Sequence, residues 1–316
     1  MIASNRSAKF PRLGFYLFWA ALLTALKPAV TADKASKPAV IWLFPAPVQI
    51  PTETAAELRR PNAVEIDDDG NIYLADTGNN RLLKLDRNLQ IIAKTSGWGS
   101  ERDLLNTPLD ITIDSGLNLF AADYLNGRIV RFDGNLNFLW EVKINLLHDA
   151  WDYPLSLALS SWGELFILEE SAGNVIQLHP AANTASVFGG FKPGQANLTG
   201  AKRLTISDDG KLYIANPEDK SVITYDRYGN FLRNVELNLP VQSLDSEGGF
   251  LWLAGSDQLA CLRGGDFIEI KFIESGVCPT EIVDIAANMG ILTVLTAESP
   301  FLLVYRLSRS PSRVVW

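Results

Sequence analysis

The strongest constraint on the fold of this 316-residue chain is a segment that is written twice without a gap. Residues 61–86 read PNAVEIDDDGNIYLADTGNNRLLKLD, and residues 108–133 read PLDITIDSGLNLFAADYLNGRIVRFD. Both share a Pro-x-x-apolar-x-Ile-Asp start, a turn, an apolar run ending in Ala-Asp, and an Asn and an Arg before the last strand. Self-similarity at a period of roughly 40–50 residues indicates a repeat architecture, in which each unit adds a few short elements.

Fainter copies of this segment follow in the same register, which makes six units in all. Each contains a short apolar strand, a turn rich in Asp, Gly or Ser, a second strand, a polar turn and a third strand. Strands of about five residues with turns at short intervals indicate an all-β structure. The sequence therefore predicts a six-bladed β-propeller. The further copies are residues 154–178, 201–226, 240–263 and 279–306.

A fourth strand follows five of the units, whereas the sixth has no obvious one. The strand-like segment AVIWLFPAPVQI, residues 39–50, precedes the first unit. We predict that it closes the ring beside residues 301–307, because closure removes unpaired strand edges. The alternative donor of this strand is SRVVW at 312–316. The other fourth strands are expected within residues 90–97, 137–144, 184–190, 230–237 and 267–274.

The motifs LADTGNNRLLKLD and AADYLNGRIVRFD resemble the A-D-x-x-N-x-R consensus of the NHL-repeat family of six-bladed β-propellers. The resemblance covers residues 39–308 and is clearest in the first two units. Asp and Asn bond readily to the backbone of a turn, and the Arg can pair with the Asp across the hairpin. We therefore expect structural roles for two sets of residues: Asp76, Asn79 and Arg81, and Asp123, Asn126 and Arg128.

The N-terminal residues read as a secretory signal. Basic residues precede the apolar run GFYLFWAALLTAL at 14–26, and VTA at 30–32 offers small residues for cleavage. Thirteen apolar residues are few for a transmembrane helix, although an uncleaved signal anchor is the alternative. We expect a signal peptide at 1–32, a linker at 33–38 and the propeller at 39–316, and hence a secreted or periplasmic protein without a membrane span after signal removal.

The net charge limits which partners the protein can bind, and the two cysteines limit its disulfide bonding. Of the 28 basic residues, four lie in the signal, which has no acidic residue, so 24 basic and 36 acidic residues remain, a formal charge of −12. Such a surface repels nucleic acid, and no nucleic-acid partner is expected. Export permits a disulfide between Cys261 and Cys278, but the fold does not require one, and two separately buried thiols are the preferred interpretation.

Propellers of related build include enzymes, and the sequence bears on two kinds. The peptide-amidating lyase depends on zinc held by several histidines, whereas this chain has only His148 and His179. The same shortage weakens a lyase function of the streptogramin type. Gluconolactonase-like hydrolases instead use oxygen ligands, which suit hard cations such as Ca²⁺. The register places these candidates at the channel mouth: Asn62, Asp110, Arg203, Gln242 and Glu281.

If a divalent cation binds, Asp110 and Glu281 are its expected ligands, although Arg203 between them would already neutralise a carboxylate. Trp98 and Trp151 lie in links between blades, and His148 and Trp151 belong to LLHDAWDYP at 146–154, the least repeat-like link. Trp98, His148 and Trp151 are therefore the candidate residues of a recognition loop. Trp252 matches Tyr73 and Tyr213 by register, so it is expected to pack between blades.

The sequence thus predicts an exported NHL-type propeller that acts as a binding or scaffolding module, without catalysis and without a cofactor. Its partner is expected to be a protein or an envelope component, and a small molecule is possible. The alternative is a small-molecule hydrolase of the gluconolactonase-like kind that depends on calcium or another divalent cation.

Overall fold

In the computed structural model, the described residues belong to one compact unit. The structure describes residues 41–45, 50–148, 151–179, 184–190, 197–263, 266–272, 279–298 and 301–307. The expected signal peptide and linker, Cys278 and the alternative closing strand at 312–316 lie outside these residues. Among the helices within them, none has the length and apolarity that crossing a membrane requires.

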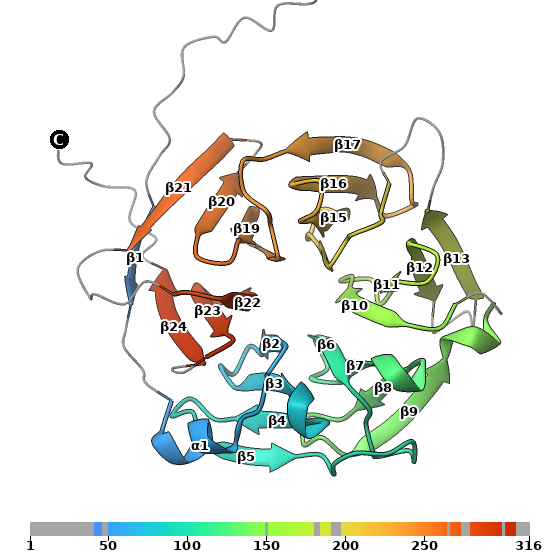
Figure 1. The fold of residues 1–316 in the computed structure, drawn as a ribbon, viewed down its shortest axis with the longest axis vertical. Helices are drawn as coiled ribbons and strands as arrows, with labels where there is room; N and C mark the ends of the chain where they lie inside the picture. The colour runs from blue at the N-terminus through green and yellow to red at the C-terminus, as the bar shows by residue number, and fades with distance from the viewer. Residues whose placement is uncertain are drawn as a thin grey trace, which may run out of the picture. The chain divides into compact units, whose positions relative to one another are not determined.

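The described strands form six blades around a common centre, which confirms the predicted all-β propeller (Figure 1). Blades 1 to 4 are separate four-stranded sheets whose antiparallel strands follow chain order, with the first strand innermost. The strands of blades 1 and 2 are β2 (Ala63–Ile66), β3 (Ile72–Asp76), β4 (Arg81–Leu85), β5 (Ile91–Lys94), β6 (Pro108–Ile113), β7 (Leu119–Asp123), β8 (Arg128–Phe132) and β9 (Phe138–Lys143). Those of blades 3 and 4 are β10 (Pro154–Leu159), β11 (Leu165–Glu169), β12 (Asn174–His179), β13 (Thr184–Gly189), β14 (Arg203–Ile206), β15 (Lys211–Asn216), β16 (Ser221–Asp226) and β17 (Phe231–Glu236).

Blades 5 and 6 are joined into one eight-stranded sheet by β1 (Ile41–Pro45), which lies between their outer edges. β1 pairs antiparallel with β24, with Leu43 opposite Leu307, so the predicted closure is confirmed for residues 43–45. It also pairs in parallel with β21, which the sequence did not indicate. The strands of these blades are β18 (Ser243–Glu247), β19 (Phe250–Ala254), β20 (Leu259–Arg263), β21 (Asp266–Phe272), β22 (Ile282–Asn288), β23 (Ile291–Thr296) and β24 (Leu302–Leu307).

Short helical turns punctuate the blades where the repeated motif requires a left-handed residue. The 3₁₀ turn η1 (Thr77–Asn79) ends at Asn80 with φ 53°, and η2 (Tyr124–Asn126) ends at Gly127 with φ 61°. Asn and Gly are the residues that adopt this conformation most readily, which explains the N-N and N-G of the two motifs. The remaining short helices are α1 (Thr52–Glu57) and η3 (Ile144–Leu146).

The hydrophobic core lies between blades and not within a single one. The buried apolar residues form six clusters in the described structure, and each cluster joins two neighbouring blades. Trp252, which is 2 % exposed, packs in the cluster between blades 5 and 6, as its register predicted. Cys261 is buried in the same cluster. Because every interface is apolar, the inner strands are held at the centre, where they surround a cavity.

Candidate functional site

The centre of the propeller holds a cavity of about 500 Å³, which residues of all six inner strands line. The lining extends from the middle of these strands into the turns that follow β2, β6, β14 and β18. It includes no residue from the links before the inner strands. The cavity therefore lies toward the face of the propeller that carries the turns between first and second strands.

Two rings of side chains are defined by the register of the inner strands with their partners. Residues two apart on a strand face the same side, so the rings lie one above the other along the channel. The first ring consists of Ala63, Asp110, Ser156, Arg203, Ser243 and Asp284. The second ring consists of Glu65, Thr112, Ala158, Thr205, Asp245 and Ala286, of which all but Ala286 line the cavity.

Side chains of the first ring fasten several blades to the blade that follows. Asp110 Oδ2 accepts a hydrogen bond from Leu157 N at 2.8 Å, and Asp284 Oδ2 accepts one from Val64 N at 2.9 Å. The hydroxyl of Ser156 accepts from the Leu204 amide at 3.1 Å in the same way. A side chain of one blade thus satisfies a backbone N–H of the next, which a buried N–H requires.

Arg203 connects the two carboxylates of the first ring. Its Nε lies 3.4 Å from Asp284 Oδ1, its Nη1 lies 4.0 Å from Asp110 Oδ1, and its Nη2 donates a hydrogen bond to Asn62 O. All three charged side chains are buried. Burial raises the pKa of Asp110 to about 6, with a further contribution from Asp284, while Arg203 opposes the rise. Arg203 of blade 4 thus connects blade 2 through Asp110, blade 6 through Asp284, and the start of blade 1 through Asn62.

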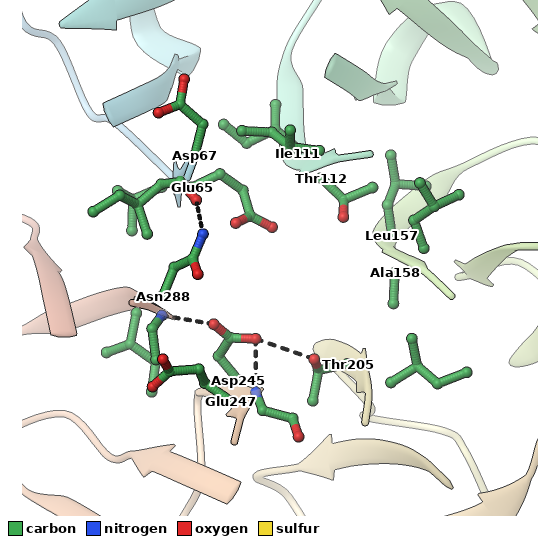
Figure 2. Close-up of a pocket in the computed structure, with 18 of the residues that line it drawn as sticks. Glu65, Asp67, Ile111, Thr112, Leu157, Ala158, Thr205, Asp245, Glu247 and Asn288 are labelled. Carbon is green, nitrogen blue, oxygen red and sulfur yellow. Dashed lines mark hydrogen bonds between the residues drawn. The ribbon is translucent and has the colours of Figure 1, made fainter. Parts of the chain in front are cut away.

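The second ring carries two carboxylates that differ in their hydrogen bonding. Asp245 accepts from Thr205 Oγ1 at 3.2 Å and from the amides of Ser246 and Ala287, each at 2.7 Å. Burial nevertheless raises the pKa of Asp245 to about 7. Glu65 projects into the cavity (Figure 2), where it has a backbone hydrogen bond with Ile66 but no side-chain donor among the described residues. Burial, and then the charge of Asp245, raise the pKa of Glu65 well above its usual value.

The opposite side of the second ring is small and uncharged. Thr112 is only 7 % exposed, and within the described part of the chain its hydroxyl has no hydrogen-bond partner although it faces the cavity (Figure 2). Ala158 follows it around the ring and presents only a methyl group. An unpartnered hydroxyl at this depth is a polar group that a ligand can satisfy.

The charge of the cavity wall is strongly acidic. Nine carboxyl side chains line it against one basic residue, Arg203. Within the described residues, no three Asp, Glu, His or Cys side chains are grouped as a metal site would require. The carboxylates are Glu65, Asp67, Asp68, Asp110, Asp114, Asp208, Asp245, Glu247 and Asp284.

The residues predicted from the sequence for the channel mouth are only partly brought together. Asp110 and Arg203 meet in the first ring as described. Asn62 lies outside the cavity lining and donates from Nδ2 to Leu109 O at 2.7 Å, so it joins blades 1 and 2. The placement of Gln242 and Glu281 is corrected, because neither lines the cavity.

The register error has a physical cause in each of these two blades. In blade 5, Val241 takes the buried place of the repeat's first Pro, so Ser243 and not Gln242 occupies the ring. In blade 6, Glu281 is exposed with φ 53° before β22, and Asp284 occupies the ring. Ile282, which is 4 % exposed, takes the place of the repeat's first Pro, so the link before this strand is three residues longer than the aligned copies predict. Sequence reasoning therefore missed Asp284 and Asp245; the Ser-x-Asp of β18 was the available signal.

The candidate recognition residues differ in how exposed they are to solvent. Trp98 is 71 % exposed in the link between blades 1 and 2. Trp151 is only 6 % exposed, packs in the cluster between blades 2 and 3, and stacks on His148 with ring centroids 5.0 Å apart. The geometry of Trp151 is that of a core residue that anchors its link, while Trp98 presents its ring to solvent.

Comparison with known proteins agrees with the fold. The sequence profile of the NHL repeat matches residues 58–85, which confirms the resemblance at the first blade. A search of curated proteins finds no match. Among solved structures, a streptogramin B lyase is 13 % identical with a TM-score of 0.57, over 79 % of this chain and 84 % of that one.

Two further solved structures have the same level of similarity. Virginiamycin B lyase from Staphylococcus aureus is 11 % identical with a TM-score of 0.58, over 82 % of this chain and 97 % of the lyase. A gluconolactonase from Xanthomonas campestris is 13 % identical with a TM-score of 0.58, over 81 % of this chain and 88 % of the enzyme. At such low identity the likeness shows a shared propeller fold and no shared chemistry.

Proposed function

We propose that the chain is an exported, non-catalytic binding module that holds a small molecule in its central cavity. The observation that carries this proposal is the state of the first-ring carboxylates. Asp110 and Asp284 are both engaged by Arg203 and by backbone amides of neighbouring blades. These two carboxylates serve as links between blades. The rest of the cavity, lined by the second ring, is therefore the place for a ligand.

The size of the cavity supports a small-molecule ligand. At about 500 Å³ it falls within the range of roughly 300–1,000 Å³ that is usual for small-molecule sites. Its wall combines several polar groups with a few small uncharged side chains, of which Thr112 and Ala158 are examples. Export is supported by the basic and apolar N-terminal segment and its small residues at 30–32.

The alternative is a hydrolase that depends on a divalent cation, and one observation favours it: the cavity wall is acidic. A calcium ion takes six to eight oxygen ligands, so several unpaired oxygens must converge on one point. Arg203 stands against such a centre in the first ring, because it is already paired with Asp110 and Asp284.

A melting scan separates the two functions. The full-length protein is heated with a chelator, and then with millimolar calcium, zinc or manganese. A site that binds only the folded state raises the melting temperature by mass action. We expect no metal-dependent shift. An upward shift that disappears in Glu65→Gln, but persists in Glu236→Gln at an exposed position of β17, would contradict a binding module and favour the hydrolase.

A second measurement addresses export. The mature protein recovered from the medium or envelope is expected to begin near Asp33, as determined by intact mass. A protein that retains residues 1–32 would contradict signal removal and support the uncleaved anchor.

A further inference from the structure

We propose that the ligand of the central cavity is an organic cation with a primary ammonium group, held by Glu65, Asp245 and Thr112. This inference rests on the proposed binding function and names its ligand class. The three side chains belong to the second ring and surround the same space (Figure 2). Two of them are carboxyl groups and the third supplies a hydroxyl oxygen, all toward one cavity.

The hydrogen-bonding capacity that remains at these groups matches an ammonium. A carboxylate has about four acceptor positions. Asp245 uses three of them, two on Oδ1 and one on Oδ2, so Oδ2 retains one position. Glu65 receives a backbone hydrogen bond from Ile66 but no side-chain donor within the described residues. Thr112 is more than nine-tenths buried as a residue, and its hydroxyl, which faces the cavity, has no partner there. A primary ammonium has three N–H donors and no acceptor.

An inorganic divalent cation fits the same groups less well. It needs several oxygens at roughly 2.3–2.6 Å from one point, and no three metal-binding side chains are so grouped in the described structure. Hydrogen bonds from an ammonium span a longer distance of about 2.7–2.9 Å when the acceptor is charged. They also tolerate acceptors on different blades. Blades 1, 2 and 5 supply Glu65, Thr112 and Asp245, respectively.

The rest of the cavity indicates that the cation is part of a larger molecule. An ammonium ion alone occupies a small part of about 500 Å³. The side of the second ring formed by Ala158 and the methyl groups of Thr112 and Thr205 is uncharged (Figure 2). A small uncharged body can therefore lie against this side while the nitrogen faces Glu65. An anionic ligand is disfavoured by the nine carboxyl groups of the wall.

The test uses three probes of similar size on the full-length protein. Benzylamine carries an ammonium, benzyl alcohol is neutral, and benzoate is an anion. Binding is measured by titration calorimetry at pH 8, together with the melting temperature. We expect benzylamine to bind and to raise the melting temperature, while benzyl alcohol and benzoate do neither.

Three variants locate the site. Glu65→Gln removes one charge at nearly constant size and is expected to weaken benzylamine binding by roughly tenfold or more. Thr112→Val removes a single neutral acceptor, so a loss of roughly threefold to tenfold is expected. Glu236→Gln removes the same charge from an exposed position of β17 and is expected to leave the affinity unchanged.

The outcomes separate this inference from the proposed function. Absence of benzylamine binding, or equal binding by Glu65→Gln and the unmodified protein, overturns the ammonium inference. Binding of benzyl alcohol or benzoate that weakens in Thr112→Val also overturns it, but leaves the cavity as a small-molecule site. A metal-dependent rise in melting temperature that Glu65→Gln abolishes contradicts both.

Discussion

At the scale of single residues, the repeated Asp-Asn-Arg motif of blades 1 and 2 holds the link that precedes its own blade. Asp123 Oδ1 accepts from the Asn106 amide at 2.6 Å, and its Oδ2 accepts from Asn126 and Arg128, each at 2.7 Å. Arg128 also donates to the carbonyls of Glu101 and of Leu104. The motif in blade 1 acts alike: Asp76 accepts from Arg59 N, Asn79 and Arg81. The sequence predicted the pairing, which is confirmed, but not its attachment to the link.

The difference in burial between the two motifs predicts a difference in stability. Asp123→Ala would leave Arg128, whose side chain is 2 % exposed, with only the partly exposed Glu141 as a carboxylate partner, at a cost of about 3–5 kcal/mol. The Arg81 side chain is 15 % exposed and also reaches Glu57, so Asp76→Ala is expected to cost about 1–3 kcal/mol. Urea denaturation gives both values.

The control for these two variants is Asp257→Ala, because Asp257 is an exposed residue between β19 and β20. It is expected to change the unfolding free energy by less than about 0.5 kcal/mol. Equal losses in all three variants would show that the motif has no special structural role.

At the scale of strands, the sequence predicts the elements more securely than their register. All five fourth strands and the closing strand at 41–45 form where the apolar alternation placed them. In blades 5 and 6 the predicted ring residue was wrong by one and by three positions, respectively. Ser243 and not Gln242, and Asp284 and not Glu281, occupy the ring. Alternation with a period of two reveals that a strand exists. It does not reveal a register irregularity or the length of the link before the strand.

The role of β1 yields a prediction at this scale. It hydrogen-bonds on both edges, to β24 and to β21, so it closes the ring and joins blades 5 and 6. Leu43→Pro removes a backbone N–H from this strand. We expect a loss of roughly 1–3 kcal/mol in the unfolding free energy, measured by urea denaturation. Leu43→Ala keeps the N–H and is the matched control; an equal loss in both variants would argue against closure through this strand.

At the scale of the whole molecule, the buried acids of the cavity couple stability to pH. The pKa of Asp110 is raised to about 6 and that of Asp245 to about 7, both mainly by burial. Glu65 is shifted in the same direction. The charged groups that face one another there are these three acids, Asp284 and Arg203. Their clustering depends on ring closure, which explains why no local motif could have revealed it.

The sign of the effect follows from proton binding. A carboxyl group whose folded-state pKa is raised binds more protons in the folded than in the unfolded state between about pH 4 and pH 7. Its stabilising contribution is present below about pH 4 and is lost as the pH rises to 7. Surface carboxylates with lowered pKa values oppose this only at lower pH, where they become protonated; they are Asp86, Asp133, Asp209 and Asp226.

We therefore predict that the unfolding free energy of the full-length protein falls by a few kcal/mol between pH 4.5 and pH 8. Urea denaturation at both pH values measures it. Glu65→Gln removes one of the raised groups and should be more stable than the unmodified protein at pH 8, with a smaller difference at pH 4.5. General repulsion among acidic residues would also lower stability at high pH, and Glu236→Gln, which removes an exposed charge, controls for it. If the two variants behave alike at pH 8, the pH dependence arises from the net charge of the surface and not from the cavity.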